Sequence, residues 1–109
     1  MAKSRRTKAV SIPRWVMEEV WERDDHKCVL CGNPQASPVC HFIRRSHGGR
    51  GIPENIWTGC LECHNKFDHI TDELWHVCAR LKLVQYFKRL YPRWDERKLI
   101  YNKWEARYE

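Results

Sequence analysis

Apolar residues recur at helical spacing in the first quarter of the chain. Ile12, Val16 and Val20 follow one another every four residues, with arginine and glutamate between them. Ser11 stands just before this run, where its hydroxyl can accept a hydrogen bond from a free amide of the first turn. A proline follows in the first turn, where its fixed backbone angle is well tolerated. The pattern therefore predicts a helix over residues 12–23.

Two short segments in the middle of the chain are rich in β-branched and aromatic residues. They cover residues 39–43 and 55–58, and the segment between them contains Gly48, Gly49 and Pro53. Short apolar runs bounded by glycine and proline are typical of strands joined by a loop. We expect a two-stranded hairpin with a long connection.

Helical signals return after the second of these segments. Residues 60–69 predict a short helix, and Asp72 can cap a longer helix that runs to Tyr91, where Pro92 stops it. Asp95 can cap one more helix near the end of the chain. We expect the long helix to present an apolar stripe of Leu74, Val77, Cys78, Leu81, Val84 and Phe87, and the last helix to carry Leu99, Ile100 and Trp104.

The length of 109 residues suits one domain with a modest core and is too short for two. Residues 1–10 carry four basic side chains, no acidic one and almost no apolar surface, which predicts a flexible basic arm. We expect residues 11–109 to form a single α+β domain, with a core over 28–69 and a helical extension over 71–109. The chain has no apolar run that could span a membrane and no apolar signal core, so a cytoplasmic location is expected.

Basic side chains outnumber acidic ones. The chain has 20 Lys and Arg against 14 Asp and Glu, which gives a formal net charge of +6 at pH 7. This balance favours a polyanionic partner and argues against proteins that buffer cations. Nucleic acid is therefore the expected class of partner, with residues 1–10 either contacting phosphates or serving as a plain solubilising tail.

Four of the six cysteines form two C-x2-C pairs, Cys28 with Cys31 and Cys60 with Cys63. Four thiolates have the number and softness that a closed tetrahedral zinc site requires. Disulfides, an iron–sulfur cluster and unrelated buried thiols are the alternatives, and the paired spacing favours structural zinc, with iron–sulfur second. A site with four protein ligands has no open position, so this ion would not itself be the catalyst. Cys78 lies outside the pairs and is expected to be a small buried hydrophobe.

Between and just after these pairs the chain carries His41, Asn55 and His64, the last directly after the second pair. With this order, the four cysteines and the glycine-rich loop, residues 28–69 resemble the HNH endonuclease family, also known as the ββα-metal or His-Me finger family. The resemblance implies a zinc-stapled hairpin–helix core flanked by helices at both ends. It also implies a metal-dependent nuclease, of the kind that bacteria and phages encode, which hydrolyses DNA and leaves a 5′-phosphate.

The chemistry of phosphodiester hydrolysis gives these residues plausible roles. The reaction needs a base for water and a metal ion that stabilises charge on the phosphate and the leaving oxygen. His41 can be the base because imidazole titrates near neutral pH, and His64 can donate a nitrogen to a divalent ion. The resemblance assigns Asn55 the hydrogen bonds that hold the strand carrying His41.

The chain departs from the family pattern at Cys40, where the family usually has an Asp or His that binds the catalytic metal. A thiolate matches magnesium poorly, so either Cys40 is not a ligand or the ion is softer, such as manganese, nickel or zinc. Asp68 offers a replacement, because it lies four residues after His64 and shares its helix face. Among the remaining histidines we expect His69 to be a weaker ligand candidate and His26, His47 and His76 to be non-ligands.

Basic side chains near these histidines are candidates for phosphate contact, which provides affinity without reading sequence. A non-catalytic zinc module that binds DNA or protein is the rival interpretation, and it would not need the histidines. A nuclease that acts on RNA is a third. Nicking or double-strand cleavage, and a monomer or a homodimer, all stay open, and no membrane association is expected. The candidate nucleic-acid-binding residues are Arg44, Arg45, Arg50 and Lys66.

Overall fold

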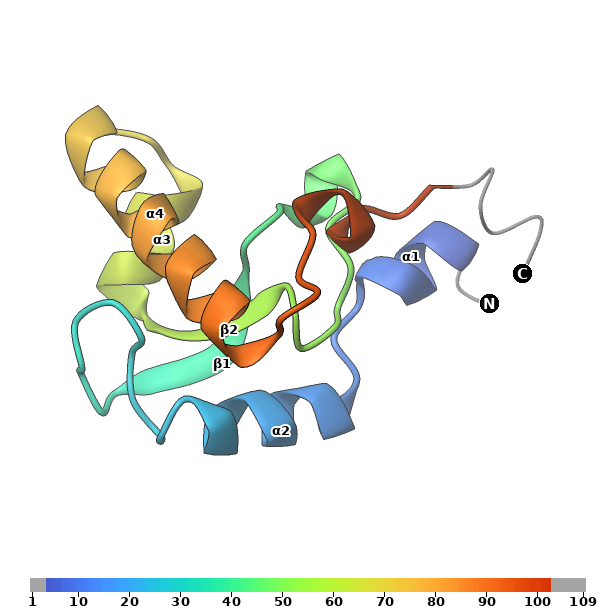
Figure 1. The fold of residues 1–109 in the computed structure, drawn as a ribbon, viewed down its shortest axis with the longest axis horizontal. Helices are drawn as coiled ribbons and strands as arrows, with labels where there is room; N and C mark the ends of the chain where they lie inside the picture. Colours follow the sequence, from blue (N-terminus) through green and yellow to red (C-terminus); the bar gives the residue numbers. More distant parts are fainter. Residues whose placement is uncertain (1–3, 103–109) are drawn as a thin grey trace.

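Two antiparallel strands with helices packed around them form the centre of the computed structural model, which describes residues 4–102 (Figure 1). The expected α+β architecture is confirmed, and the four paired cysteines lie together in it. None of the described helices is long and apolar enough to cross a membrane. In chain order the elements are α1 (Arg5–Val10), α2 (Arg14–Arg23), β1 (Ala36–His41), the 3-10 helix η1 (Arg45–His47), β2 (Ile56–Cys60), α3 (Leu61–Asp68), α4 (Glu73–Leu90) and the 3-10 helix η2 (Glu96–Leu99).

The predicted hairpin is confirmed, with its strands shifted by up to three residues. Strands β1 and β2 pair antiparallel, with Ala36 opposite Cys60 and His41 opposite Ile56. The register is irregular between Ser37 and Cys40, where the strand contains a proline that cannot donate to the ladder. The long connection between the strands therefore leaves from His41 and returns just before Ile56.

Helix α2 buries Val16 and Val20 of the predicted stripe but begins at Arg14, so Ile12 and the predicted cap Ser11 lie before it. Val16 and Val20 are fully buried and form a small cluster with Ile56 of β2. The main core lies on the other side of the hairpin, where aromatic rings from several elements meet. Phe42 and Phe87 pack edge to face at 5.9 Å, and Phe87 stacks on the Trp94 ring at 5.7 Å. The hairpin is thus covered on both faces.

Helix α4 has the expected ends but buries a different face. The Asp72 side chain accepts a hydrogen bond from an amide of the first turn, as predicted. The face in the core is formed by Ala79, Leu83 and Phe87, so the predicted stripe is wrong apart from Phe87 and the half-buried Val84. The helix has apolar side chains on two faces, and only the contact with the hairpin decides which one is buried. The remaining members of the predicted stripe, Leu74, Val77, Cys78 and Leu81, are exposed.

The N-terminal segment differs from the expected flexible arm. Ser4 caps helix α1, and the helix ends at Val10, which is 5% exposed. The guanidinium of Arg6 donates to the main-chain oxygens of two residues in η1, and the Gly51 amide donates to the Ala9 oxygen at 2.9 Å. Contacts with the connection between the strands thus hold a segment whose composition alone predicts no order.

The last predicted helix is a short 3-10 turn. Asp95 caps it as expected and Leu99 is buried, but Ile100 is 39% exposed. The chain leaves the turn because Ile100 forms a β-bridge with Gly49 and the Tyr101 amide donates to the Gly48 oxygen. Trp104 lies outside the described residues.

Candidate functional site

The four paired cysteines converge at one end of the hairpin. Their sulfur atoms all lie within 4.8 Å of one another, and the Sγ atoms of Cys31 and Cys60 are 3.6 Å apart. This separation is far longer than a disulfide bond of about 2.0 Å. It is close to the sulfur–sulfur edge of about 3.8 Å in a tetrahedron of zinc–sulfur bonds. The group could hold a metal ion, and its chemistry and size fit zinc.

Local backbone geometry places the two pairs. Gly32, with a φ of +80°, ends the tight turn after Cys28, and its amide donates to the Cys28 oxygen at 2.8 Å. The Val29 amide donates to Thr58 of β2, which attaches this turn to the hairpin. Cys60 ends β2 and caps α3, because its sulfur accepts from the Cys63 amide. A bound ion would therefore link the turn after α2 to the junction of β2 and α3.

His41 lies at the end of β1 with its ring buried and oriented. Its Nε2 atom is 2.9 Å from the main-chain oxygen of Val10, which can only accept, so Nε2 carries the proton and donates. The Nδ1 atom is left to accept a proton. Burial lowers the pKa of His41 below its ordinary value of 6.5, and the nearby Arg45 guanidinium lowers it further, against the opposing effect of the Val10 oxygen. His41 is therefore neutral at pH 7.

His64 and Asp68 lie one turn apart on α3. The His64 Nε2 and an Asp68 carboxylate oxygen are 2.9 Å apart, and each side chain is about one third exposed. Both line the same open cavity of about 730 Å³ as His41. An imidazole nitrogen and a carboxylate oxygen are ligands that divalent ions accept. The shared helix face expected from their spacing is confirmed.

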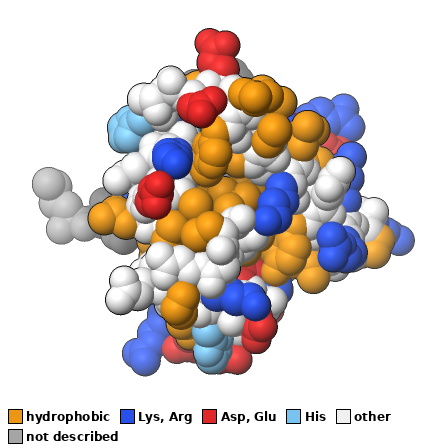
Figure 2. Space-filling view, turned by 90° about the vertical axis from the view of Figure 1, so that its left-hand side faces the viewer, with side chains coloured by type: hydrophobic (Ala, Val, Ile, Leu, Met, Phe, Trp, Pro, Cys, Tyr) orange, Lys and Arg blue, Asp and Glu red, His pale blue; other side chains and the backbone are white. Residues whose placement is uncertain are grey.

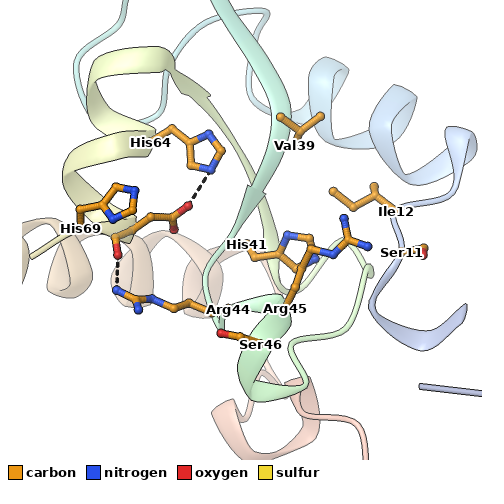
Figure 3. Close-up of a pocket in the computed structure, with 10 residues that line it drawn as sticks. Ser11, Ile12, Val39, His41, Arg44, Arg45, Ser46, His64 and His69 are labelled. Atoms are coloured by element: carbon orange, nitrogen blue, oxygen red, sulfur yellow. Dashed lines mark hydrogen bonds and ion pairs between the residues drawn. The ribbon is translucent and has the colours of Figure 1, made fainter. Parts of the chain in front are cut away.

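Side chains from distant parts of the chain surround this cavity. Figure 3 shows His41 and Arg45 on one side of the opening and His64 and His69 on the other. The Arg44 guanidinium reaches toward the end of α3 and donates to the main-chain oxygen of Asp68. The lining is Ser11, Ile12, Val39, His41, Arg44, Arg45, Ser46, His64, Asp68 and His69.

Asn55 ties together the two ends of the connection between the strands. Its side chain is fully buried, where Oδ1 accepts from the Ile43 amide at 2.7 Å and Nδ2 donates to the Arg50 oxygen at 2.8 Å. The Phe42 amide donates to the main-chain oxygen of Asn55 at 2.7 Å. These bonds hold the segment that directly follows His41.

Cys40 lies on the other face of β1 from His41, as neighbours on a strand do. It is fully buried in the main core, and its sulfur would be 2.8 Å from a Cβ built at Gly59. Burial raises the pKa of the Cys40 thiol, and the Asp68 carboxylate adds to this effect. The structure therefore does not bring this candidate ligand into the cavity.

Two of the four basic residues singled out in the sequence, Arg44 and Arg45, line the cavity, and the other two lie outside it. The Arg50 guanidinium lies 5.7 Å from the centre of the Tyr101 ring. Lys66 pairs with Glu62 at 3.1 Å and lies over the Trp75 ring.

Of the other four histidines, one lines the cavity and three lie outside it. His69, the weaker ligand candidate, lines the cavity. His76 stacks on Phe67 at 4.9 Å, His26 pairs with Glu22 at 2.8 Å, and His47 is exposed at the end of η1. These three histidines do not line the cavity.

The N-terminal contributions to the cavity were not predicted. Ser11 and Ile12 line it and Val10 orients His41, whereas the sequence pattern predicts only an arm and the start of a helix there. A β-branched Val10 at the end of an otherwise polar arm is the one signal that could have indicated docking.

Searches against protein-family models, curated proteins and solved structures found no match to the chain.

Proposed function

We propose that this chain is a metal-dependent endonuclease that hydrolyses DNA phosphodiester bonds, as the resemblance of residues 28–69 to the HNH family implies. One observation supports it most. His41 from β1 faces the same open cavity as His64 and Asp68 from α3, with two arginines on its lining. His41 and His64 are 23 positions apart in the chain, and only the fold brings their side chains to one cavity.

In this proposal His41 is the general base. Its Nε2 is occupied by the Val10 oxygen, so the ring can take a proton from water only at Nδ1. The lowered pKa keeps the ring neutral and ready to accept that proton at pH 7. Asn55 is a positioning residue, because its hydrogen bonds hold the segment that follows His41.

His64 and Asp68 are the residues that would hold a divalent ion such as manganese, magnesium, nickel or zinc. When bound, the ion stabilises negative charge on the phosphate and the leaving oxygen. A set of one nitrogen and one oxygen from the protein leaves room for water and substrate phosphate. Cys40 has no part in this ligand set because its thiol is buried on the opposite face of β1.

Arg44 and Arg45 would contact the DNA phosphates. Arg44 lines the cavity, and one of its terminal nitrogens donates to the end of α3. A net charge of +6 favours the approach of any polyanion. Such contacts provide affinity without sequence specificity.

A non-catalytic zinc module is the second candidate, and one observation favours it. Within residues 4–102, the four cysteines are the only group of three or more potential metal ligands close enough to share one ion. A module of this kind needs the cysteine site alone.

Plasmid cleavage separates the two candidates. We expect the purified protein to nick or cut supercoiled DNA only with an added divalent ion, and His41→Ala to lower the rate about 100- to 10,000-fold with zinc content and DNA binding preserved. His47→Ala is the matched control, because this histidine is exposed outside the cavity. Absence of cleavage with magnesium, manganese, nickel and cobalt would favour the binding module, and the same assay on RNA tests the third interpretation.

A further inference from the structure

An apolar cavity of about 490 Å³ lies beside η2, and it shares no lining residue with the cavity of His41. It is formed where η2, the turn after α4 and the connection between the strands meet. A cavity of this size with mostly apolar walls is typical of sites that bind a small organic group. Two of the walls are aromatic, which favours a flat ring as the occupant. The apolar walls are Ile52, Tyr91, Pro92, Trp94 and Leu99.

Trp94 is held rigidly at the boundary of this cavity. Its indole Nε1 donates to the main-chain oxygen of Glu54 at 2.8 Å, and its ring stacks on Phe87 of the core at 5.7 Å. The side chain is nevertheless only half-buried. A ligand that packs against Trp94 therefore does not have to immobilise it first.

A basic cleft of about 470 Å³ adjoins the apolar cavity, between the end of α4 and η2. Four residues line both, so a ligand of modest size can occupy the two together. The shared residues are Arg93, Trp94, Asp95 and Lys98.

The charges in the basic cleft leave an excess of cations. Asp95 pairs with Arg97 at 2.9 Å. Glu96 pairs with Arg80. Both acidic side chains of the cleft are thus engaged, and the remaining cations can neutralise an anion such as a phosphate. The cations of the cleft that form no ion pair with another residue of the described range 4–102 are Lys88, Arg93 and Lys98.

These cations distinguish the site from another apolar surface of the protein. Hydrophobic side chains also gather over α3 and the beginning of α4, with charged ones around them (Figure 2). No described residue there indicates which molecule would cover that face. Beside η2, in contrast, the combination of an apolar cavity and a basic cleft selects an anion that carries a flat apolar group.

We propose that the apolar cavity and the basic cleft together bind a nucleotide with an unpaired base, as part of a single strand of nucleic acid. The base would enter the cavity beside Trp94, and its phosphate would lie in the cleft. Glu54 lines the cavity but not the cleft, so the opposite orientation would bring the phosphate toward a carboxylate. Aromatic surface beside cations that follow the backbone is the general basis of single-strand binding. A paired base lies inside the duplex and cannot enter such a cavity.

NMR titration of the zinc-loaded full chain, without any other divalent ion, tests this site separately from cleavage. We expect deoxyadenosine 5′-monophosphate to shift the indole N–H signal of Trp94 and the amide signal of Lys98. Deoxyribose 5-phosphate lacks the base and deoxyadenosine lacks the phosphate, so each should bind at least about fivefold more weakly. Equal binding of either fragment, or shifts confined to the cavity of His41, would overturn the proposal.

Longer probes distinguish a strand from a free nucleotide. A single strand of twelve deoxyadenylates should bind at least about tenfold more tightly than the monophosphate, because more of its phosphates meet cations. The same strand paired with its complement should leave the Trp94 indole signal unmoved. Equal affinity for the monophosphate would overturn the assignment to a strand, and a Trp94 shift with the duplex would overturn the requirement for an unpaired base.

Two neighbouring positions on α4 provide a matched pair of variants. Lys88 lines the basic cleft, whereas Arg89 is equally exposed and lines neither the cleft nor the apolar cavity. Lys88→Glu should weaken binding of the single strand about tenfold, and Arg89→Glu should weaken it less than about twofold. Both variants change the net charge by the same amount, so equal losses would show a general electrostatic effect and contradict the proposed site.

Discussion

Substitution of Gly51 by alanine tests whether the docked N-terminal segment orients His41. A Cβ built at Gly51 lies 1.9 Å from the main-chain oxygen of Ser11 and 3.0 Å from the Cα of Ile12. Normal contact requires about 3.2 Å, so Gly51→Ala must displace this segment by more than 1 Å. The Val10 oxygen directly precedes it in the chain and would move with it.

The expected loss of activity follows from this displacement. A catalytic group misplaced by about 1 Å costs roughly 100-fold in rate, so Gly51→Ala should lower plasmid cleavage by about that factor. The zinc content should not change, since Gly51 does not belong to the cysteine site. The overlap should also cost about 1–3 kcal/mol of unfolding free energy, measured by urea denaturation.

The pKa of His41, measured by NMR titration, distinguishes misorientation from a general loss of structure. Burial is the largest influence on this pKa and lowers it. Displacement of the segment exposes the ring, so the pKa should rise toward 6.5 in Gly51→Ala. In a variant that lacks residues 1–10, Gly51→Ala should lower cleavage little further, because the two changes remove the same contact. Cleavage at the normal rate together with a raised His41 pKa would refute the argument that the Val10 oxygen orients the base.

Four further outcomes are expected. The purified protein should contain about one zinc per chain, and a strong chelator should abolish its helical circular dichroism because ion binding contributes to folding; a metal-free protein that stays folded would contradict this. Asp68→Ala should raise the ion concentration for half-maximal cleavage about tenfold or more while Cys40→Ser leaves it unchanged, and manganese should act faster than magnesium; the opposite order of the two variants would make the thiolate the ligand. Because folding lowers the pKa of His41, cleavage should rise with pH and level off by pH 7, and the unfolding free energy should fall as pH drops below about 6.5, where the unfolded chain takes up the proton more readily. Asp24→Ala should cost about 3–5 kcal/mol in urea denaturation, because this buried carboxylate pairs with Arg23 at 2.7 Å and accepts from a β2 amide and a tyrosine hydroxyl; a loss under about 1 kcal/mol would contradict the network.

The elements that the sequence predicts well are those with local causes. Asp72 caps α4 through an amide three residues away, and the pairs beginning at Cys28 and Cys60 form tight turns within a few residues. Interactions of this range depend on neighbouring residues alone, so spacing and residue type suffice to anticipate them.

The residues of the candidate site could be predicted only in part. His41, Asn55 and His64 are recognisable through their order relative to the cysteines. Their partners are not, because Val10 reaches His41 across 31 residues and Asp24 reaches the Thr58 amide across 34. Contacts between residues so far apart produce no repeating pattern in the sequence from which they could be predicted.

The four-cysteine group, the hairpin and the capped long helix could be predicted because residue order carries their signals: two C-x2-C pairs, β-branched runs bounded by glycine and proline, and a capping aspartate. Packing of the whole chain is needed to show that α4 buries Leu83 and leaves Leu81 exposed, that Cys40 faces the core, and that α1 docks beside His41. A helix or strand with apolar residues on two faces satisfies the same pattern in either orientation. Which of the two faces is buried depends on the surface that the rest of the folded chain packs against it.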